Sequence, residues 1–222
     1  PRGRLFEDYL RIAKQIDARW LLFENVRGLV TARGPDGVPG SALALIRDEL
    51  RKAGWQTKLN LLNAADFGVA QRRVRLILIG HHEGDAPRFP IATHSKDGAA
   101  GRPWVTLGEC VSDIAPVADD EFIWPNRDLK EQLELLPPGK GVRSPGKAET
   151  TRPGGHWGYK QGAFVADLAH PARTITANAQ QDWIRDPIHG LRRLTPRECA
   201  AVQSFPRCWR FNGARLDQYR LI

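Results

Sequence analysis

Trp20-Leu21-Leu22-Phe23-Glu24-Asn25-Val26 is a short apolar run that ends in polar residues. Four consecutive apolar side chains predict a buried strand with polar residues at its carboxyl end. A carboxylate at the carboxyl end of a parallel strand lies where open α/β sheets bind ligands. Considered alone, however, Glu24 is explained as well by a solvated strand end.

Helices and further strands are predicted around this run. The expected order is helix, strand, helix, strand, strand, in segments 5–18, 20–23, 41–53, 55–61 and 73–79. The first helix carries one apolar face, formed by Leu5, Tyr9, Ile12, Ala13 and Ile16. Gly54 follows the second helix at the position of a C-cap glycine, and Gly80 follows the last strand. This order predicts an open α/β sheet with helices packed on it.

The later part of the chain differs in composition and periodicity. Segment 87–170 is rich in Gly and Pro and has little helical periodicity, which predicts a second, less regular domain. A helix then begins at Thr195-Pro196-Arg197-Glu198, where Thr195 can cap the first turn and Glu198 can complete a capping box. Arg193, Arg197 and Gln203 remain available for a ligand or a domain interface.

Composition narrows the class of protein. A net charge of +8 favours a polyanionic partner, nucleic acid first, although an ordinary soluble basic protein has the same charge. No apolar run approaches the length of a membrane span, so we expect no membrane partner. The three cysteines form no CxxC pair and the histidines are isolated or merely adjacent, so we expect neither disulfides nor a metal site. A reducing cytoplasm fits this cysteine usage.

A second motif is the basic run Gln71-Arg72-Arg73-Val74-Arg75. In a strand, Gln71, Arg73 and Arg75 share one face. The other face, which can enter a core, is formed by Val74, Leu76 and Leu78. Neighbouring guanidiniums repel one another, so the pattern favours an anionic or carbonyl-rich partner such as phosphate or base edges. An exposed edge strand kept soluble by charge is the alternative.

Together, and in this order, the motifs resemble the DNA cytosine-5 methyltransferase family from its fifth signature motif through its ninth. Arg2–Phe6 resembles the RGxLF motif and Phe23–Val26 matches the ENV motif. Asn63–Arg75 resembles the "A-x-D-[YF]-G-V-P-Q-x-R-x-R" stretch, with Ala70 in place of the usual Pro. The ninth motif and the approach to the last one are resembled by segments 173–176, 193–206 and 211–222.

The resemblance implies a fold and an activity. The fold is α/β, a partial Rossmann-like methyltransferase sheet plus a smaller irregular, mainly β target-recognition domain. The implied domains are 1–88 (partial catalytic domain), 89–210 (target recognition, with the ninth motif) and 211–222 (return toward the catalytic domain). The implied reaction transfers a methyl group from S-adenosylmethionine to C5 of a flipped cytosine in duplex DNA, in a restriction-modification context.

The resemblance also assigns roles to individual residues. Glu24 becomes the partner of the cytosine N3, and burial against apolar neighbours would favour the protonated form that this role needs. Arg75 becomes the partner of O2, and Arg73 lies near the backbone phosphate. Asn25 organises the loop around Glu24, and Leu5 packs against the adenine of the cofactor.

DNA contacts are expected outside the catalytic motifs as well. Basic residues interspersed with Gly suit phosphate contacts, although each of them is explained equally by solvated loop charge. The DNA-binding candidates are Gln71, Arg73, Lys140, Arg143, Lys147, Arg152 and Lys160.

Several family motifs have no counterpart in this sequence. The glycine-rich cofactor loop, the closing Gly-Asn-Ala-Val motif and the nucleophilic Pro-Cys dipeptide are not found, since no Cys follows a Pro. We therefore expect an incomplete enzyme, either a truncated piece or a split subunit that works with a complementary N-terminal methyltransferase chain. A non-catalytic, sequence-specific DNA-binding module derived from the family is the alternative. An unrelated basic α/β RNA-binding protein would require the motif series to be coincidence.

Overall fold

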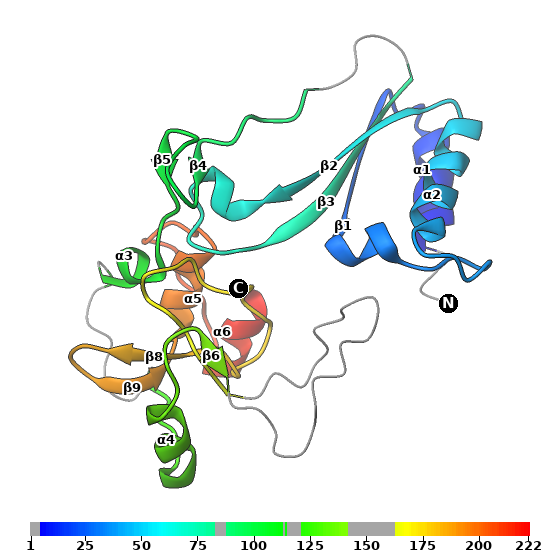
Figure 1. Ribbon diagram of the computed structural model, residues 1–222. Helices are drawn as coiled ribbons and strands as arrows, with labels where there is room; N and C mark the ends of the chain where they lie inside the picture. Colours follow the sequence, from blue (N-terminus) through cyan, green and yellow to red (C-terminus); the bar gives the residue numbers. More distant parts are fainter. Residues whose placement is uncertain (1–4, 83–87, 113, 115–120, 142–162) are drawn as a thin grey trace. The chain divides into compact units, whose positions relative to one another are not determined.

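A computed structural model describes residues 5–82, 88–112, 114, 121–141 and 163–222 (Figure 1). The described chain forms two compact units. The first is made of residues 5–62, 74–82 and 88–91, and the second contains the remaining described segments. No helix in these segments is long and apolar enough to cross a membrane.

The first unit has the predicted order of elements. Its helices and strands are α1 (Leu5–Gln15), β1 (Trp20–Val26), the 3-10 helix η2 (Arg27–Thr31), α2 (Ser41–Lys52), β2 (Gln56–Asn63) and β3 (Val74–His81). Gly54 adopts a left-handed φ of 95° just after α2, as expected for a residue that ends a helix. The mixed α/β class predicted from the periodicity is therefore confirmed.

The three strands form one sheet in the order β1-β3-β2. β1 runs antiparallel to β3, with Trp20 opposite His81 and Val26 opposite Arg75. The parallel neighbour expected for β1 is therefore not its partner in the described sheet. β1 also continues through Val26, so Glu24 lies within the strand and not beyond its end.

One face of the sheet is packed. Leu21, Leu76 and Leu78 are buried there. They belong to one core cluster with residues from the two helices and the turn after α2, namely Ala13, Leu43, Leu50 and Trp55. Gly80 lies opposite Leu21, and a Cβ at Gly80 would come within 2.7 Å of the Leu21 side chain. Only glycine fits this close approach of the two strands.

The apolar face predicted for the first helix is only partly correct. Tyr9 and Ala13 pack on the core, but Leu5, Ile12 and Ile16 are 69%, 48% and 69% exposed. The core instead takes the neighbouring stripe Phe6, Tyr9, Leu10 and Ala13, whose spacing of three and four residues also keeps one helix face.

The opposite face of the sheet is exposed along β1. Trp20, Leu22 and Val26 point away from the core and are 51%, 61% and 49% exposed. The prediction of a fully buried strand is therefore wrong, because only the alternate residues Leu21 and Phe23 join the core. Along β3 the same face is better covered, since Ile77 and Ile79 are half-buried and His81 is buried.

The second unit consists of short elements. Its elements are η3 (Ala64–Phe67), β4 (His94–Ser95), β5 (Arg102–Pro103), α3 (Leu107–Ser112), α4 (Arg127–Glu134), β6 (Lys140–Gly141), β7 (Phe164–Val165), β8 (Trp183–Asp186), β9 (Gly190–Arg193), α5 (Pro196–Val202) and α6 (Arg215–Leu221). Its strands are short, and they form the sheet β6-β7-β8-β9 and the pair β4-β5.

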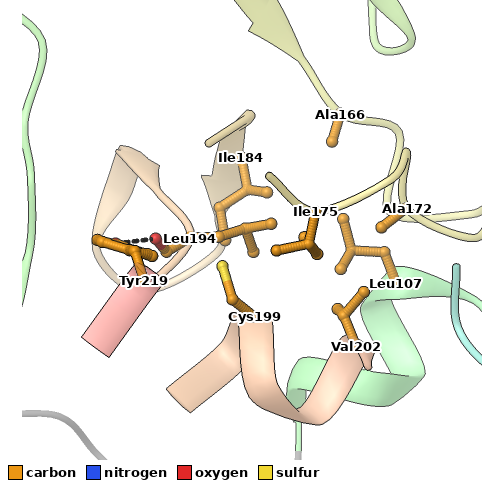
Figure 2. Packing of buried hydrophobic residues seen from close by; sticks show 9 residues of the cluster. All are labelled: Leu107, Ala166, Ala172, Ile175, Ile184, Leu194, Cys199, Val202 and Tyr219. Carbon is orange, nitrogen blue, oxygen red and sulfur yellow. Dashed lines mark hydrogen bonds between the residues drawn. The ribbon is translucent and has the colours of Figure 1, made fainter. Parts of the chain in front are cut away.

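The core of the second unit gathers around α5. Cys199 and Val202 of this helix pack against Leu107 of α3 and Ile184 of β8 (Figure 2). Tyr219 of α6 closes the cluster, and its hydroxyl donates a hydrogen bond of 2.6 Å to the buried carbonyl of Leu194 (Figure 2).

Candidate active site

Glu24 and Arg75 form an ion pair on the face of the sheet that is exposed along β1. Arg75 lies opposite Val26 in the β1–β3 ladder, so its side chain projects from the same face as Glu24, two residues back along β1. The distance between Arg75 Nε and Glu24 Oε1 is 2.9 Å. The antiparallel register therefore brings together the two residues that the resemblance assigned to the cytosine ring.

The two members of the pair differ in exposure. The Glu24 side chain is 49% exposed and the Arg75 side chain is 21% exposed. The burial against apolar neighbours that would favour a protonated Glu24 is therefore only partial in the described chain. Leu22 and Val26, on either side of Glu24 on this face, are apolar but themselves 61% and 49% exposed.

This geometry can recognise a polar ring edge. Arg75 Nη1 also donates to the Val74 carbonyl at 3.0 Å, which fixes the plane of the guanidinium. The planar Arg75 guanidinium offers hydrogen-bond donors, and the Glu24 carboxyl oxygen beside it offers an acceptor. Such a pair suits a heterocycle whose neighbouring atoms are an oxygen acceptor and a ring nitrogen.

Asn25 and Leu5 lie elsewhere in the first unit. The Asn25 Oδ1 accepts a hydrogen bond of 2.8 Å from the amide N–H of Val26, where β1 passes into η2. Leu5 is the first residue of α1 and is 69% exposed. No contact in the described chain joins Leu5 to the Glu24–Arg75 pair.

Gln71 does not share a strand face with Arg75. β3 begins only at Val74, and Gln71 pairs instead with Ala172 in the second unit. The main chain continues this pairing, since the Arg72 amide donates to the Ala172 carbonyl at 2.8 Å. The predicted common face of Gln71, Arg73 and Arg75 is therefore wrong, whereas the burial of Leu76 and Leu78 on the other face is confirmed.

The DNA-binding candidates differ in their surroundings. Gln71 is only 1% exposed, and its Oε1 accepts no hydrogen bond from the described residues. Lys140 is exposed at the start of β6. The other candidates of segment 142–162 lie outside the described residues, namely Arg143, Lys147, Arg152 and Lys160.

The motif from Arg193 to Pro206 serves the core of the second unit. The capping box is present: the Glu198 amide donates to Thr195 Oγ1 at 3.3 Å, and the Thr195 amide donates to Glu198 Oε2 at 2.7 Å. Arg193 lies over the Trp183 ring at 4.2 Å, and Gln203 donates to the Ile222 carbonyl. Arg197 alone of the three candidates remains exposed.

Sequence reasoning missed a buried ion cluster beside this motif. Arg192 is 5% exposed and binds Glu198 through both terminal nitrogens, at 2.9 and 2.7 Å, and Asp186 through Nε at 2.8 Å. Burial alone would raise the pKa of Asp186, but the amides of His189 and Ile188 and the Arg192 guanidinium lower it to about 2. No local sequence pattern predicts this cluster, because its residues come into contact only when β8, β9 and α5 pack together.

The three cysteines differ in burial. Cys199 is fully buried in the core, and burial raises the pKa of its thiol, so the reactive thiolate is disfavoured. Cys110 is half-buried and Cys208 is exposed, both as free thiols. Among the residues that the structure describes, no three metal-ligating side chains cluster.

Comparison with known proteins extends these observations to the whole chain. The chain is 26% identical to the type II methyltransferase M1.HphI of Haemophilus parahaemolyticus and 30% identical to M.NgoFVII of Neisseria gonorrhoeae. Both matches cover 100% of the chain, but the chain spans only 57% and 58% of those relatives. The S. pombe Dnmt2 methyltransferase has the same fold, with a TM-score of 0.63 at 15% identity, over 100% of the chain and 67% of that protein.

A sequence model of one family matches residues 1–222 without a break. Its description is C-5 cytosine-specific DNA methylase. The resemblance inferred from the ENV and QRRVR motifs is thus confirmed, and the chain belongs to the family of C-5 cytosine-specific DNA methylases.

Proposed function

We propose that this chain supplies the base-binding and target-recognition parts of a DNA cytosine-5 methyltransferase. The enzyme would transfer a methyl group from S-adenosylmethionine to C5 of a cytosine flipped out of duplex DNA. The flip is required because C5 and C6 cannot be reached inside the base stack. The observation that carries the proposal is the Glu24–Arg75 pair, at 2.9 Å, in a chain whose whole length matches the family.

Each member of the pair has a role that follows from its chemistry. Attack on C6 of cytosine builds negative charge on the ring, which a proton donor at N3 and a cation at O2 would stabilise. Glu24 is proposed at N3 and Arg75 at O2. Their separation in the free chain fits two adjacent positions of one ring edge, and closing the exposed face over the base would remove the water that now surrounds Glu24.

Two further residues are proposed to support the pair. Asn25, whose side chain accepts the Val26 amide, holds the end of β1 beside Glu24. Arg73, two residues before Arg75, is proposed to contact the DNA backbone phosphate. In DNA binding it would act together with the basic residues of segment 140–160. Gln71, which is 1% exposed, would contact DNA only if it became exposed in the complex.

S-adenosylmethionine is the proposed methyl donor. The described residues suit contact with only one part of this cofactor. The exposed apolar side chain of Leu5 suits contact with an adenine ring. One apolar contact cannot hold a cofactor that also carries charged amino-acid and sulfonium groups. The remaining cofactor contacts are therefore expected from residues outside the described chain.

The nucleophile is also expected from outside this sequence. A cysteine thiolate that attacks C6 needs an exposed thiol with a lowered pKa, whereas Cys199 is buried with a raised one. The chain spans 57% of its M1.HphI relative, and we propose that the rest is provided either by another part of the same polypeptide or by a complementary N-terminal methyltransferase chain. The uncovered apolar residues Trp20, Leu22 and Val26 support this proposal, because they need a partner surface to bury them.

Domain 89–210 is proposed to recognise the target sequence in a restriction-modification context. The relatives named type II methyltransferases support this setting. A DNA-binding module without catalysis is the alternative. It needs neither Glu24 nor Arg75, and the pairing of both on one face of the sheet therefore favours the enzyme.

Replacement of Glu24 by Gln in the complemented enzyme tests the proposal. Glu24→Gln keeps the size of the side chain but removes proton donation, so turnover should fall by roughly 10²- to 10⁴-fold while duplex affinity changes little. Glu7→Gln, on the exposed surface of α1, is the matched control. An unchanged rate in Glu24→Gln would remove Glu24 from the mechanism. Duplex binding without any methyl transfer, in wild type as well, would favour the non-catalytic module.

A further inference from the structure

A second concave site lies within the second unit, built by the end of α5, the segment after it and α6. Its volume is about 570 Å³, within the range of small-molecule pockets. None of its lining residues belongs to the Glu24–Arg75 pair or to the first unit. The catalytic proposal therefore leaves this pocket without a function.

Three aromatic rings form one wall of the pocket. Phe205 contacts Phe211 edge to face, with ring centroids 5.1 Å apart. Trp209 completes the group, at 6.1 Å from Phe205 and 6.5 Å from Phe211. Trp209 nevertheless stays 56% exposed, so much of its indole is open to a ligand. Large exposed indoles with an anchored neighbour are well suited to stack on a planar ring.

The rest of the lining is strongly basic. Four arginines line the pocket, Arg197, Arg207, Arg210 and Arg215, against one carboxylate, Glu121. Arg207 donates to the Cys110 carbonyl at 2.9 Å and Arg210 to the Arg207 carbonyl at 3.4 Å, so the charges of both are oriented but not neutralised by these contacts. Arg197 is exposed and makes no ion pair with any described residue. Guanidiniums gathered in this way repel one another unless an anion joins them.

We propose that this pocket binds a nucleotide, with the base stacked on Trp209 and the phosphate held by Arg197 and Arg210. A purely apolar ligand would leave the guanidiniums unused, and a lone phosphate would leave the aromatic wall unused. A nucleotide combines a planar ring with an anion at a spacing that a pocket of about 570 Å³ accommodates. The nucleotide is either free or the unpaired residue of a single strand, since a base stacked within a duplex cannot enter.

Fluorescence polarisation of the full chain with a labelled single-stranded oligo(dA) tests the proposal. Trp209→Ala should weaken binding roughly tenfold or more, because it removes one base-stacking platform. Arg197→Ala should weaken it severalfold and lower the slope of log affinity against log salt by about one. Arg197 is exposed and makes no ion pair with the residues that the structure describes, so this variant stays informative even if Trp209→Ala disturbs the fold.

Two matched variants control for surface changes elsewhere in the same unit. Trp124 is 49% exposed and packs on Phe122, and the Arg127 side chain is 90% exposed beside Glu131. Trp124→Ala and Arg127→Ala should bind oligo(dA) like wild type. Trp209→Ala and Trp124→Ala should bind duplex DNA with equal affinity.

Competition by dAMP identifies the source of the nucleotide. If dAMP displaces oligo(dA), a free nucleotide suffices, and if it does not while both pocket variants lose affinity, an extended strand is the ligand. The proposal is overturned if wild type shows no saturable binding of either probe. It is also overturned if the pocket variants behave like their controls.

Discussion

Arg75 faces Val26 across the β1–β3 ladder, and its Nε lies 2.9 Å from Glu24 Oε1, diagonally across the same face of the sheet. Two groups from motifs far apart in the sequence thus meet through strand register alone. Because side chains alternate along a strand, a slip of one residue in this pairing would send Arg75 into the core and leave Glu24 alone. The antiparallel register is therefore part of the proposed catalytic apparatus.

Arg75→Gln should impair the reaction through the same step as Glu24→Gln. In the complemented enzyme, loss of the guanidinium should lower turnover by roughly 10²- to 10³-fold, since it stabilises charge only as the transition state forms. The loss of transition-state stabilisation in the double variant should be smaller than the sum of the losses in the two single variants, because the residues act as a pair. Single-turnover kinetics measures both effects, with Arg11→Gln as the exposed control. Strict additivity would mean that the two residues act independently.

Leu22→Lys tests whether the uncovered face of the sheet is an interface. Leu22 is 61% exposed, so the lysine should leave the free energy of unfolding nearly unchanged. If a complementary chain covers this face, the buried ammonium should weaken assembly by tenfold or more, measured by analytical ultracentrifugation of the mixture. Val38→Lys, at a 54% exposed valine outside the sheet, is the control. Equal assembly of both variants would show that the face is not the interface.

Stability of the second unit should depend on acid through Asp186. Its folded pKa of about 2 lies below the value of roughly 3.9 expected when unfolded, so its contribution is present above about pH 4 and is lost as pH falls toward 2. Urea unfolding measures the free energy of unfolding of wild type and of Asp186→Asn. The difference between the two free energies should be about 2 kcal/mol smaller at pH 2 than at pH 5. A difference that stays constant over this range would contradict the assigned shift.

The Tyr219 hydroxyl should stabilise the second core through one hydrogen bond. Tyr219→Phe leaves the buried Leu194 carbonyl without its donor, at a cost of about 1–3 kcal/mol. Tyr9→Phe removes a similar bond, 3.2 Å long, to the exposed carbonyl of Leu22, where water can replace it. Urea unfolding should therefore show a clearly smaller loss for Tyr9→Phe. Equal losses would mean that burial of the Leu194 carbonyl does not matter.

Local signals in the sequence predicted what depends on local physics. The alternation that placed Leu76 and Leu78 in the core and the capping box at Thr195 were both confirmed, because each is fixed by residues within one turn or one strand. The membership of the family also followed from motifs in order.

Long-range pairing accounts for what the sequence did not reveal. Gln71 does not belong to the strand of Arg75, because its main chain pairs with Ala172, a partner that no local sequence pattern predicts. The sequence also did not reveal that Glu24 is 49% exposed, because it lies on the face of β1 that does not join the core. The bonds of Arg192 to Asp186 and Glu198 likewise arise only from tertiary packing.

Transfer of a labelled methyl group from S-adenosylmethionine to duplex DNA tests the central claim most directly. The chain is assayed alone and mixed with a family N-terminal polypeptide that carries the Pro-Cys loop, using wild type and Glu24→Gln. We expect labelled DNA only in the mixture, and a large loss of labelling with Glu24→Gln. Labelling by the chain alone, or undiminished labelling with Glu24→Gln in the mixture, would contradict it.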